Sequence, residues 1–184
     1  MKFLSLIALG ILLAVSASAQ KTNDVIQKQI RSLKADKMIE LSFDGGASKI
    51  FAHAENFSDA EARAAHVEAM NFGMAYFYPG TTLSMPVETI NLTFWVLTKK
   101  PQFGNDTKWI VTLPGETLDL GVVPQYTSKP GNKMEYLNFT IKRSDLAKIA
   151  AASGVKFKLG KADLTFTPGH LQMFRDILAI SDTK

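Results

Sequence analysis

Histidine is the side chain best suited to proton transfer or metal binding in this sequence, which contains three: His53, His66 and His170. His53-Ala54-Glu55 matches half of a zinc deaminase signature, but the other half needs two cysteines and the chain has none. His66 has no second histidine four residues away, so it cannot complete an H-E-x-x-H zinc site. The sequence therefore predicts no metal site.

His170 follows Thr167 and Pro168 at the start of a predicted helix, where unpaired backbone N–H groups favour an anion. A cofactor-free hydrolase that uses His170 or His53 with a nearby Asp or Ser is therefore one alternative. The sequence contains no G-x-S-x-G, G-x-x-x-x-G-K-[ST] or G-x-G-x-x-G motif, which argues against a serine elbow and a bound nucleotide. We expect no cofactor, and we assign no catalytic residue.

The first nineteen residues have the organisation of a secretory signal peptide. Lys2 gives a positive start, residues 3–15 are apolar but shorter than the roughly 20 residues that span a membrane, and Ala17-Ser18-Ala19 is a small-residue cleavage site. We expect residues 20–184 to form one soluble domain, secreted or periplasmic, without a transmembrane segment. The lack of cysteine excludes disulfides, and a net charge of +4 is too small to favour nucleic acid as a partner.

The strand pattern is clearest at Glu88–Thr98, where apolar and polar side chains alternate. Ile90, Leu92, Phe94 and Val96 fall on one side, and Thr89, Asn91, Thr93 and Trp95 fall on the other. Similar alternation predicts seven further strands, at Met38–Phe43, Lys49–Ala54, Trp109–Leu113, Thr117–Val123, Met134–Lys142, Val155–Leu159 and Leu164–Phe166. Short turns after Glu88–Thr98 predict that this strand and the next two form a meander.

Helices are predicted before, within and after these strands. Their expected ranges are Asn23–Ala35, Ser58–Tyr78 with Ser58 and Glu61 as a capping box, Ser144–Ala152, and a final helix capped by Thr167. An apolar stripe of Val67, Met70, Met74 and Phe77 supports the second helix. Its aromatic end, Tyr76–Tyr78, allows a membrane-surface protein as a further alternative. The fold class favoured is α+β, a largely antiparallel sheet of about eight strands covered by helices, with a β-sandwich bearing peripheral helices as the alternative.

The C-terminal part combines Glu135-Tyr-Leu-Asn-Phe139, Leu146-Ala-Lys-Ile-Ala150, Val155-Lys-Phe-Lys-Leu-Gly160, and Phe166 before a closing helix. Over this quarter of the chain the sequence resembles uncharacterised bacterial secreted proteins. The resemblance implies no activity and no site residue.

The outward sides of the strands collect aromatic and basic side chains, which predict a binding face. Its candidate residues are Trp95, Tyr136, Lys142, Lys156 and Lys158, with Ile110 beside them. A face of this composition could bind a protein partner, a glycan or an anionic polymer. The sequence therefore favours a non-enzymatic binding or interaction domain that is secreted or periplasmic, with the ligand undefined.

Overall fold

The computed structural model describes residues 20–33, 38–84, 87–128, 131 and 133–182, so the predicted signal peptide lies outside the described residues. Within these ranges the chain forms twelve strands and four helices. The strands are β1 (Gln20–Thr22), β2 (Ile39–Asp44), β3 (Ala47–His53), β4 (Ala69–Pro79), β5 (Thr82–Ser84), β6 (Thr89–Leu97), β7 (Lys108–Leu113), β8 (Glu116–Val122), β9 (Gln125–Ser128), β10 (Met134–Lys142), β11 (Lys156–Leu159) and β12 (Ala162–Thr165). The helices are α1 (Asn23–Ser32), α2 (Asp59–Ala64), α3 (Arg143–Ala151) and α4 (Pro168–Ile180).

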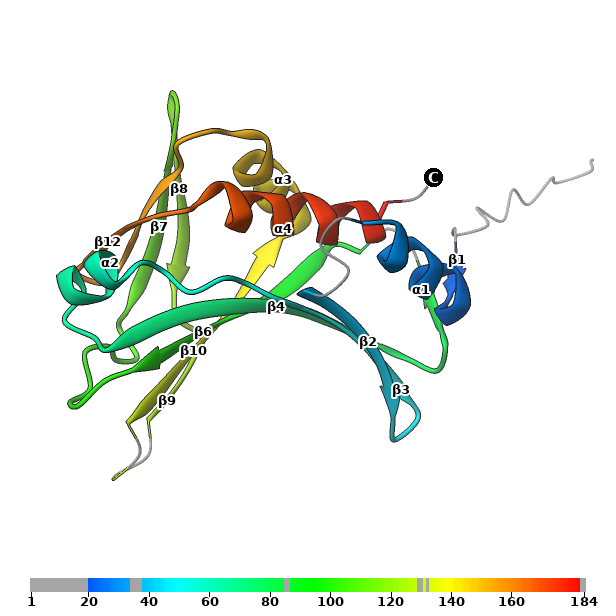
Figure 1. The fold of residues 1–184 in the computed structure, drawn as a ribbon, viewed down its shortest axis with the longest axis horizontal. Coiled ribbons are helices and arrows are strands. Elements are labelled where there is room, and N and C mark those ends of the chain that lie inside the picture. The colour runs from blue at the N-terminus through cyan, green and yellow to red at the C-terminus, as the bar shows by residue number, and fades with distance from the viewer. Residues whose placement is uncertain (1–19, 34–37, 85–86, 129–130, 132, 183–184) are drawn as a thin grey trace, which may run out of the picture.

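The largest unit is a six-stranded sheet in the order β2-β3-β4-β6-β10-β9, with every pair antiparallel. The sheet is arched, with α1, α3 and α4 above its convex side, and its concave side faces away from these helices (Figure 1). A largely antiparallel sheet with helices agrees with the predicted class. The predicted number of strands was too low, because β1, β4, β5 and β9 were not anticipated.

A four-stranded sheet, β12-β11-β7-β8, packs against one end of the convex side. The two sheets meet through aromatic rings: Phe94 on β6 lies 5.5 Å from Trp109 and 5.9 Å from Phe157, measured between ring centroids. Burying side chains of this size contributes about 1.5–3 kcal/mol each, so this contact is a major source of stability. The strands β1 and β5 form a separate two-stranded sheet.

The alternation predicted for β6 is confirmed. Ile90, Leu92, Phe94 and Val96 are fully buried, whereas Thr93 and Trp95 on the other side are partly exposed. The predicted meander of β6, β7 and β8 is wrong, because β6 pairs with β4 and β10 while β7 pairs with β8 and β11. Residues 98–107 form a connection long enough to carry the chain from one sheet to the other.

The predicted helix Ser58–Tyr78 is also wrong beyond its first turns. The Ser58–Glu61 capping box is present, but α2 ends at Ala64 and the following segment is β4. On β4 the buried residues include Met70, Phe72, Met74, Tyr76 and Tyr78, which alternate with a period of two. Pairing with both β3 and β6 satisfies the backbone of this segment, and that tertiary context outweighs its helix-like apolar spacing.

This correction removes the aromatic helix end on which the membrane-surface alternative depended. Tyr76 and Tyr78 are buried, and Phe77 alone of the three is exposed. Within the described ranges, none of the helices has the length and apolar character needed to cross a bilayer.

The strand β8 departs from the predicted alternation. Leu118 is buried as expected, but Leu120 is half-buried and Val122 is exposed. The pairing of β7 with β8 shifts register between Lys108 and Ile110, which moves the end of β8 out of the alternating pattern.

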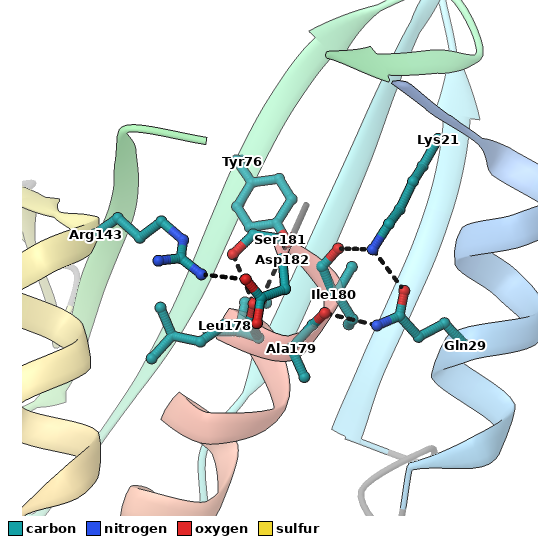
Figure 2. A network of polar contacts seen from close by, with 10 residues as sticks. Lys21, Gln29, Tyr76, Arg143, Leu178, Ala179, Ile180, Ser181 and Asp182 are labelled. Carbon is teal, nitrogen blue, oxygen red and sulfur yellow. Dashed lines mark hydrogen bonds and ion pairs between the residues drawn. The ribbon is translucent and has the colours of Figure 1, made fainter. Parts of the chain in front are cut away.

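The C-terminal helix α4 is fixed at both ends. Thr167 caps its start, as predicted, and Pro168 is its first residue. At its end, Lys21 Nζ donates a hydrogen bond to the Ile180 carbonyl (3.3 Å), and Gln29 Nε2 donates to the Ala179 carbonyl (2.6 Å), as Figure 2 shows. These donors satisfy carbonyls that a helix end leaves unpaired, and they attach β1 and α1 to α4.

Candidate functional site

The concave face of the six-stranded sheet carries the side chains that alternate with the buried ones. The register places Trp95 opposite Tyr136, Thr93 opposite Asn138, and Asn91 opposite Thr140 across β6 and β10. A hollow of about 510 Å³ lies on this face, within the 300–1,000 Å³ typical of small-molecule sites. Its floor consists of small or polar side chains, namely Ala75, Asn91, Thr93, Asn138 and Thr140, and the aromatic and basic side chains on the concave side are Lys49, Phe51, Phe77, Trp95 and Tyr136. Pro124, Gln125 and Phe139 complete the lining, and we refer to these thirteen residues as the hollow.

Trp95 is held in place by the backbone beneath it. A Cβ atom added to Gly73 on β4 would lie 2.5 Å from Cη2 of the Trp95 indole, so the ring fits only because residue 73 has no side chain. Phe51 on β3 meets the indole edge-on, with centroids 5.7 Å apart. The aromatic wall is therefore ordered by its neighbours, with no ligand required to fix it.

The polar floor is joined across the strands. Thr93 Oγ1 donates to Asn138 Oδ1 at 2.6 Å, and Thr140 Oγ1 donates to Asn91 Oδ1 at 3.3 Å. Both amide oxygens are thus used as acceptors. Among the described residues, the Nδ2 groups of Asn91 and Asn138 have no hydrogen-bond partner, so each amide can still donate to a ligand.

Lys49 supplies the charge of the hollow. Its ammonium lies 4.3 Å from the centroid of Phe51 and 5.6 Å from that of Phe77, which places it over two aromatic faces. No carboxylate in the described part of the chain lies within ion-pair distance of Lys49, and no Asp or Glu lines the hollow. The hollow therefore has a net positive charge.

The five residues predicted as a binding face do not form one cluster. Trp95 and Tyr136 are direct cross-strand neighbours in the hollow. Lys142 is at the far end of β10 and exposed, outside the hollow. Lys156 and Lys158 lie on β11 in the other sheet, where Lys158 forms an ion pair with Asp163 at 3.3 Å. The predicted aromatic pair is thus brought together, and the predicted lysines are not.

Sequence reasoning missed the contribution of β3 and β4 to this face. Lys49 and Phe51 alternate with buried residues in a strand that was predicted, so their shared side was readable from the sequence. Phe77 falls within the helix predicted for Ser58–Tyr78, and that prediction concealed that Phe77 lies on the concave side of the sheet with Lys49 and Phe51. No signal in the sequence identified this side of β4, because the segment is apolar at nearly every position and its spacing fits a helix and a strand alike.

His170 has a structural role in this fold. The ring is fully buried; Nδ1 accepts a hydrogen bond from the Thr167 backbone N–H at 3.2 Å, and Nε2 donates to the Glu55 carbonyl at 2.9 Å. Burial lowers the pKa of His170, partly opposed by the hydrogen bond to Glu55. With both nitrogens bonded to backbone groups, the imidazole has no free atom with which to activate a nucleophile.

The other two histidines lie apart from His170. His53 is exposed at the end of β3, with Nε2 3.8 Å from Glu40 Oε1. His66 follows α2 with a φ of 59°, in place of the mid-helix position predicted, and it lines a second hollow of about 450 Å³ with Asp106 and Lys161. No group of three or more His, Asp or Glu side chains in the described ranges is placed to hold a metal ion.

A scan of protein-family models and searches of curated proteins and of solved structures find no match to this chain. The chemistry of the concave face is consequently what points to a function. Among the described residues it combines ordered aromatic surface, amide donors without a hydrogen-bond partner and one lysine without a carboxylate partner, which is a set suited to holding a ligand.

Proposed function

We propose that this protein is a secreted or periplasmic, non-enzymatic binding domain whose ligand occupies the hollow on the concave face. The observation that carries this proposal is the combination of accessible aromatic rings and unpartnered polar groups in one hollow. Phe77 is 61% exposed, and the Nδ2 groups of Asn91 and Asn138 lack partners among the described residues. Export is supported by the sequence of residues 1–19, which has the features of a signal peptide.

The shape of the sheet supports the same proposal. Helices α1, α3 and α4 lie on its convex side, so the described elements leave the concave side uncovered (Figure 1). The aromatic side chains there do not serve the core, because the core is built from the alternate residues of the same strands. Gly73 and Phe51 hold the Trp95 indole in position before any ligand arrives. This side chain therefore loses less conformational entropy on binding.

The hydrolase alternative has less support. His170 is bonded at both nitrogens, and the polar neighbour of His53 on the described surface is a carboxylate, Glu40, with no hydroxyl nucleophile hydrogen-bonded to either group. A Ser-His-acid arrangement would require such a bond. The geometry therefore favours binding over catalysis.

The two tryptophans allow a direct test with residues 20–184. In a ¹H–¹⁵N spectrum, each indole N–H gives one signal: Trp95 reports on the hollow, and the fully buried Trp109 serves as an internal control. We would titrate a panel of probes comprising neutral and acidic sugar trimers, a medium-chain fatty acid and a tripeptide. The proposal expects at least one probe to shift the Trp95 signal while leaving that of Trp109 in place.

Two variants locate the binding. Phe77→Ala removes an exposed ring in the hollow. Phe43→Ala removes a comparably exposed ring (54%) on edge strand β2, on the convex side of the sheet and so on the face opposite to the hollow. The first change should weaken the probe about tenfold and the second should not, since a stacked ring is worth about 1 kcal/mol or more. If no probe moves the Trp95 signal, or if calorimetry shows that binding survives Phe77→Ala and Trp95→Ala unchanged, the hollow is not the binding site.

A further inference from the structure

We propose that the ligand of the hollow is an acidic glycan, a short run of pyranose rings that carries a carboxylate. This inference rests on the proposed function and adds the chemical class of the ligand. It follows from the described residues that line the hollow: aromatic rings on both sides, hydroxyl and amide groups between them, one lysine, and no carboxylate.

The floor distinguishes a sugar from an apolar ligand. Asn91, Thr93, Asn138 and Thr140 form two hydrogen-bonded pairs across β6 and β10, and each pair keeps an unbonded amide N–H₂. An acyl chain lying over this floor would strip water from both amides without replacing its hydrogen bonds, which is unfavourable. Sugar hydroxyls accept such bonds and also donate to the Thr oxygens, so a saccharide satisfies the floor.

The walls suit the other surface of a sugar ring. A pyranose presents a face of C–H groups, and the negative face of an aromatic ring attracts them while excluding water. Trp95 offers an indole supported from below by the Gly73 backbone, and Phe51 braces its edge. Phe77, on β4, is separated from Trp95 by the small floor residues Ala75 and Asn91, which leaves an aromatic surface on each side of the floor.

Lys49 specifies the charge of the ligand. Its ammonium is held near Phe51 and Phe77 and has no carboxylate partner among the described residues, so it is free to pair with an anionic group. A carboxylate on the sugar stacked at this wall would provide that group through a charge-assisted hydrogen bond. One cation with no Arg beside it matches one carboxylate per site, whereas a polyphosphate or nucleic acid backbone calls for several.

The test compares acidic sugars with their own neutral derivatives. Residues 20–184 would be titrated with trimers of galacturonic, mannuronic and guluronic acid and with the methyl ester of each, using calorimetry and the Trp95 indole signal. At least one free acid should bind with a shift of the Trp95 signal, and its methyl ester should bind about tenfold more weakly because it cannot pair with Lys49.

Variants separate the two parts of the recognition. Lys49→Met should weaken the acid about tenfold and leave the ester unchanged, so that the two bind alike, while Trp95→Ala should weaken both by at least about tenfold. Lys28→Met makes the same charge change at an exposed position on α1 and should alter neither. Circular dichroism and urea unfolding of each variant verify that the fold is intact.

Other outcomes overturn the inference in distinguishable ways. If the fatty acid or the tripeptide shifts the Trp95 signal and depends on Phe77 while no uronate binds, the ligand class is wrong and the proposed binding function stands. If Lys49→Met weakens acid and ester equally, the carboxylate assignment is wrong. If no probe of any class moves the Trp95 signal, both the inference and the proposed function fail.

Discussion

Phe94 and Trp95 are consecutive residues on β6, yet they lie in very different surroundings. Phe94 is fully buried on the convex side, where its ring meets Phe72, Trp109, Phe139 and Phe157. Trp95 is partly exposed on the concave side, beside Phe51 and Tyr136 at the edge of a small and polar floor. One alternating strand thus supplies both the core and the candidate site, which means that stability and binding can be changed independently, one residue apart.

The largest effect is expected on the convex side. Phe94→Ala removes a ring at the junction of the two sheets and leaves a cavity among four other aromatic rings, so the free energy of unfolding should fall by about 3–5 kcal/mol. Urea unfolding followed by far-UV circular dichroism measures this loss. Trp95→Ala is the matched control on the same strand and should cost less than half as much while weakening probe binding, measured by calorimetry, by at least about tenfold. Equal losses from the two changes would mean that the two faces do not differ as described.

The second effect concerns the fit between the backbone and the indole. Gly73→Ala places a Cβ 2.5 Å from Trp95 and 2.9 Å from the Ala52 carbonyl oxygen, so the indole must move and β4 must shift slightly. Overpacking of this kind costs about 1–3 kcal/mol. We expect a red shift of Trp95 fluorescence together with weaker probe binding.

A double-mutant cycle with Trp95→Ala tests the cause of that loss. If the indole is what the new methyl group displaces, Gly73→Ala should cost less in the Trp95→Ala background, and the difference measures their coupling. If the stability costs of the two substitutions are additive, the whole cost of Gly73→Ala comes from its contact with the Ala52 carbonyl oxygen. The position of the indole would then not depend on Gly73.

The contrast between the two faces explains how far the sequence could be interpreted. The alternation at Glu88–Thr98 and Met134–Lys142 correctly identified which apolar residues are buried, because a half-buried strand has a period of two. The segment that became β4 is apolar at nearly every position, so its spacing fitted a helix and a strand alike. Only its pairing with β3 and β6 decides between them, and that pairing is set by residues distant in the sequence.

The candidate site was half predictable for the same reason. Trp95 and Tyr136 each had a visible outward side, and the two strands happen to be neighbours. Lys156 and Lys158 show an equally clear alternation, but β11 belongs to the other sheet. Periodicity gives the side of a strand on which a residue lies, whereas the sheet and the neighbours of that strand come from the tertiary fold.

A pH-dependent effect should arise on the convex side, from His170 on α4. Burial holds the pKa of His170 below the usual 6.5, so the unfolded chain takes up a proton at a higher pH than the folded protein does. The contribution of neutral His170 is therefore fully present above about pH 6.5 and is lost as the pH falls through that value towards the pKa of the folded state. Urea unfolding at pH 8 and pH 5 measures the difference.

The informative variant is His170→Gln, because Gln at this position can keep the capping box with Thr167 but does not titrate. At pH 8 the variant should be about 1–2 kcal/mol less stable, through loss of the bond to the Glu55 carbonyl and of ring packing. Its stability should vary less between pH 8 and pH 5 than that of the parent protein. If His170→Gln keeps the parental difference between pH 8 and pH 5, another group is responsible.

The smallest effect is expected where β1 and α1 meet the end of α4. Lys21→Met retains the apolar stem but removes the ammonium that donates to Ile180 and Gln29, and with it a positive charge at the negative end of the helix dipole (Figure 2). The free energy of unfolding should fall by about 0.3–1 kcal/mol, and less at high salt, where the charge is screened. Lys28 on α1 is exposed and makes no such contact with the described residues, so Lys28→Met should cost nothing measurable. Because Lys21 acts on the helix side of the sheet, probe binding in the hollow should be identical in both variants, and a change in binding would show that the two faces are coupled.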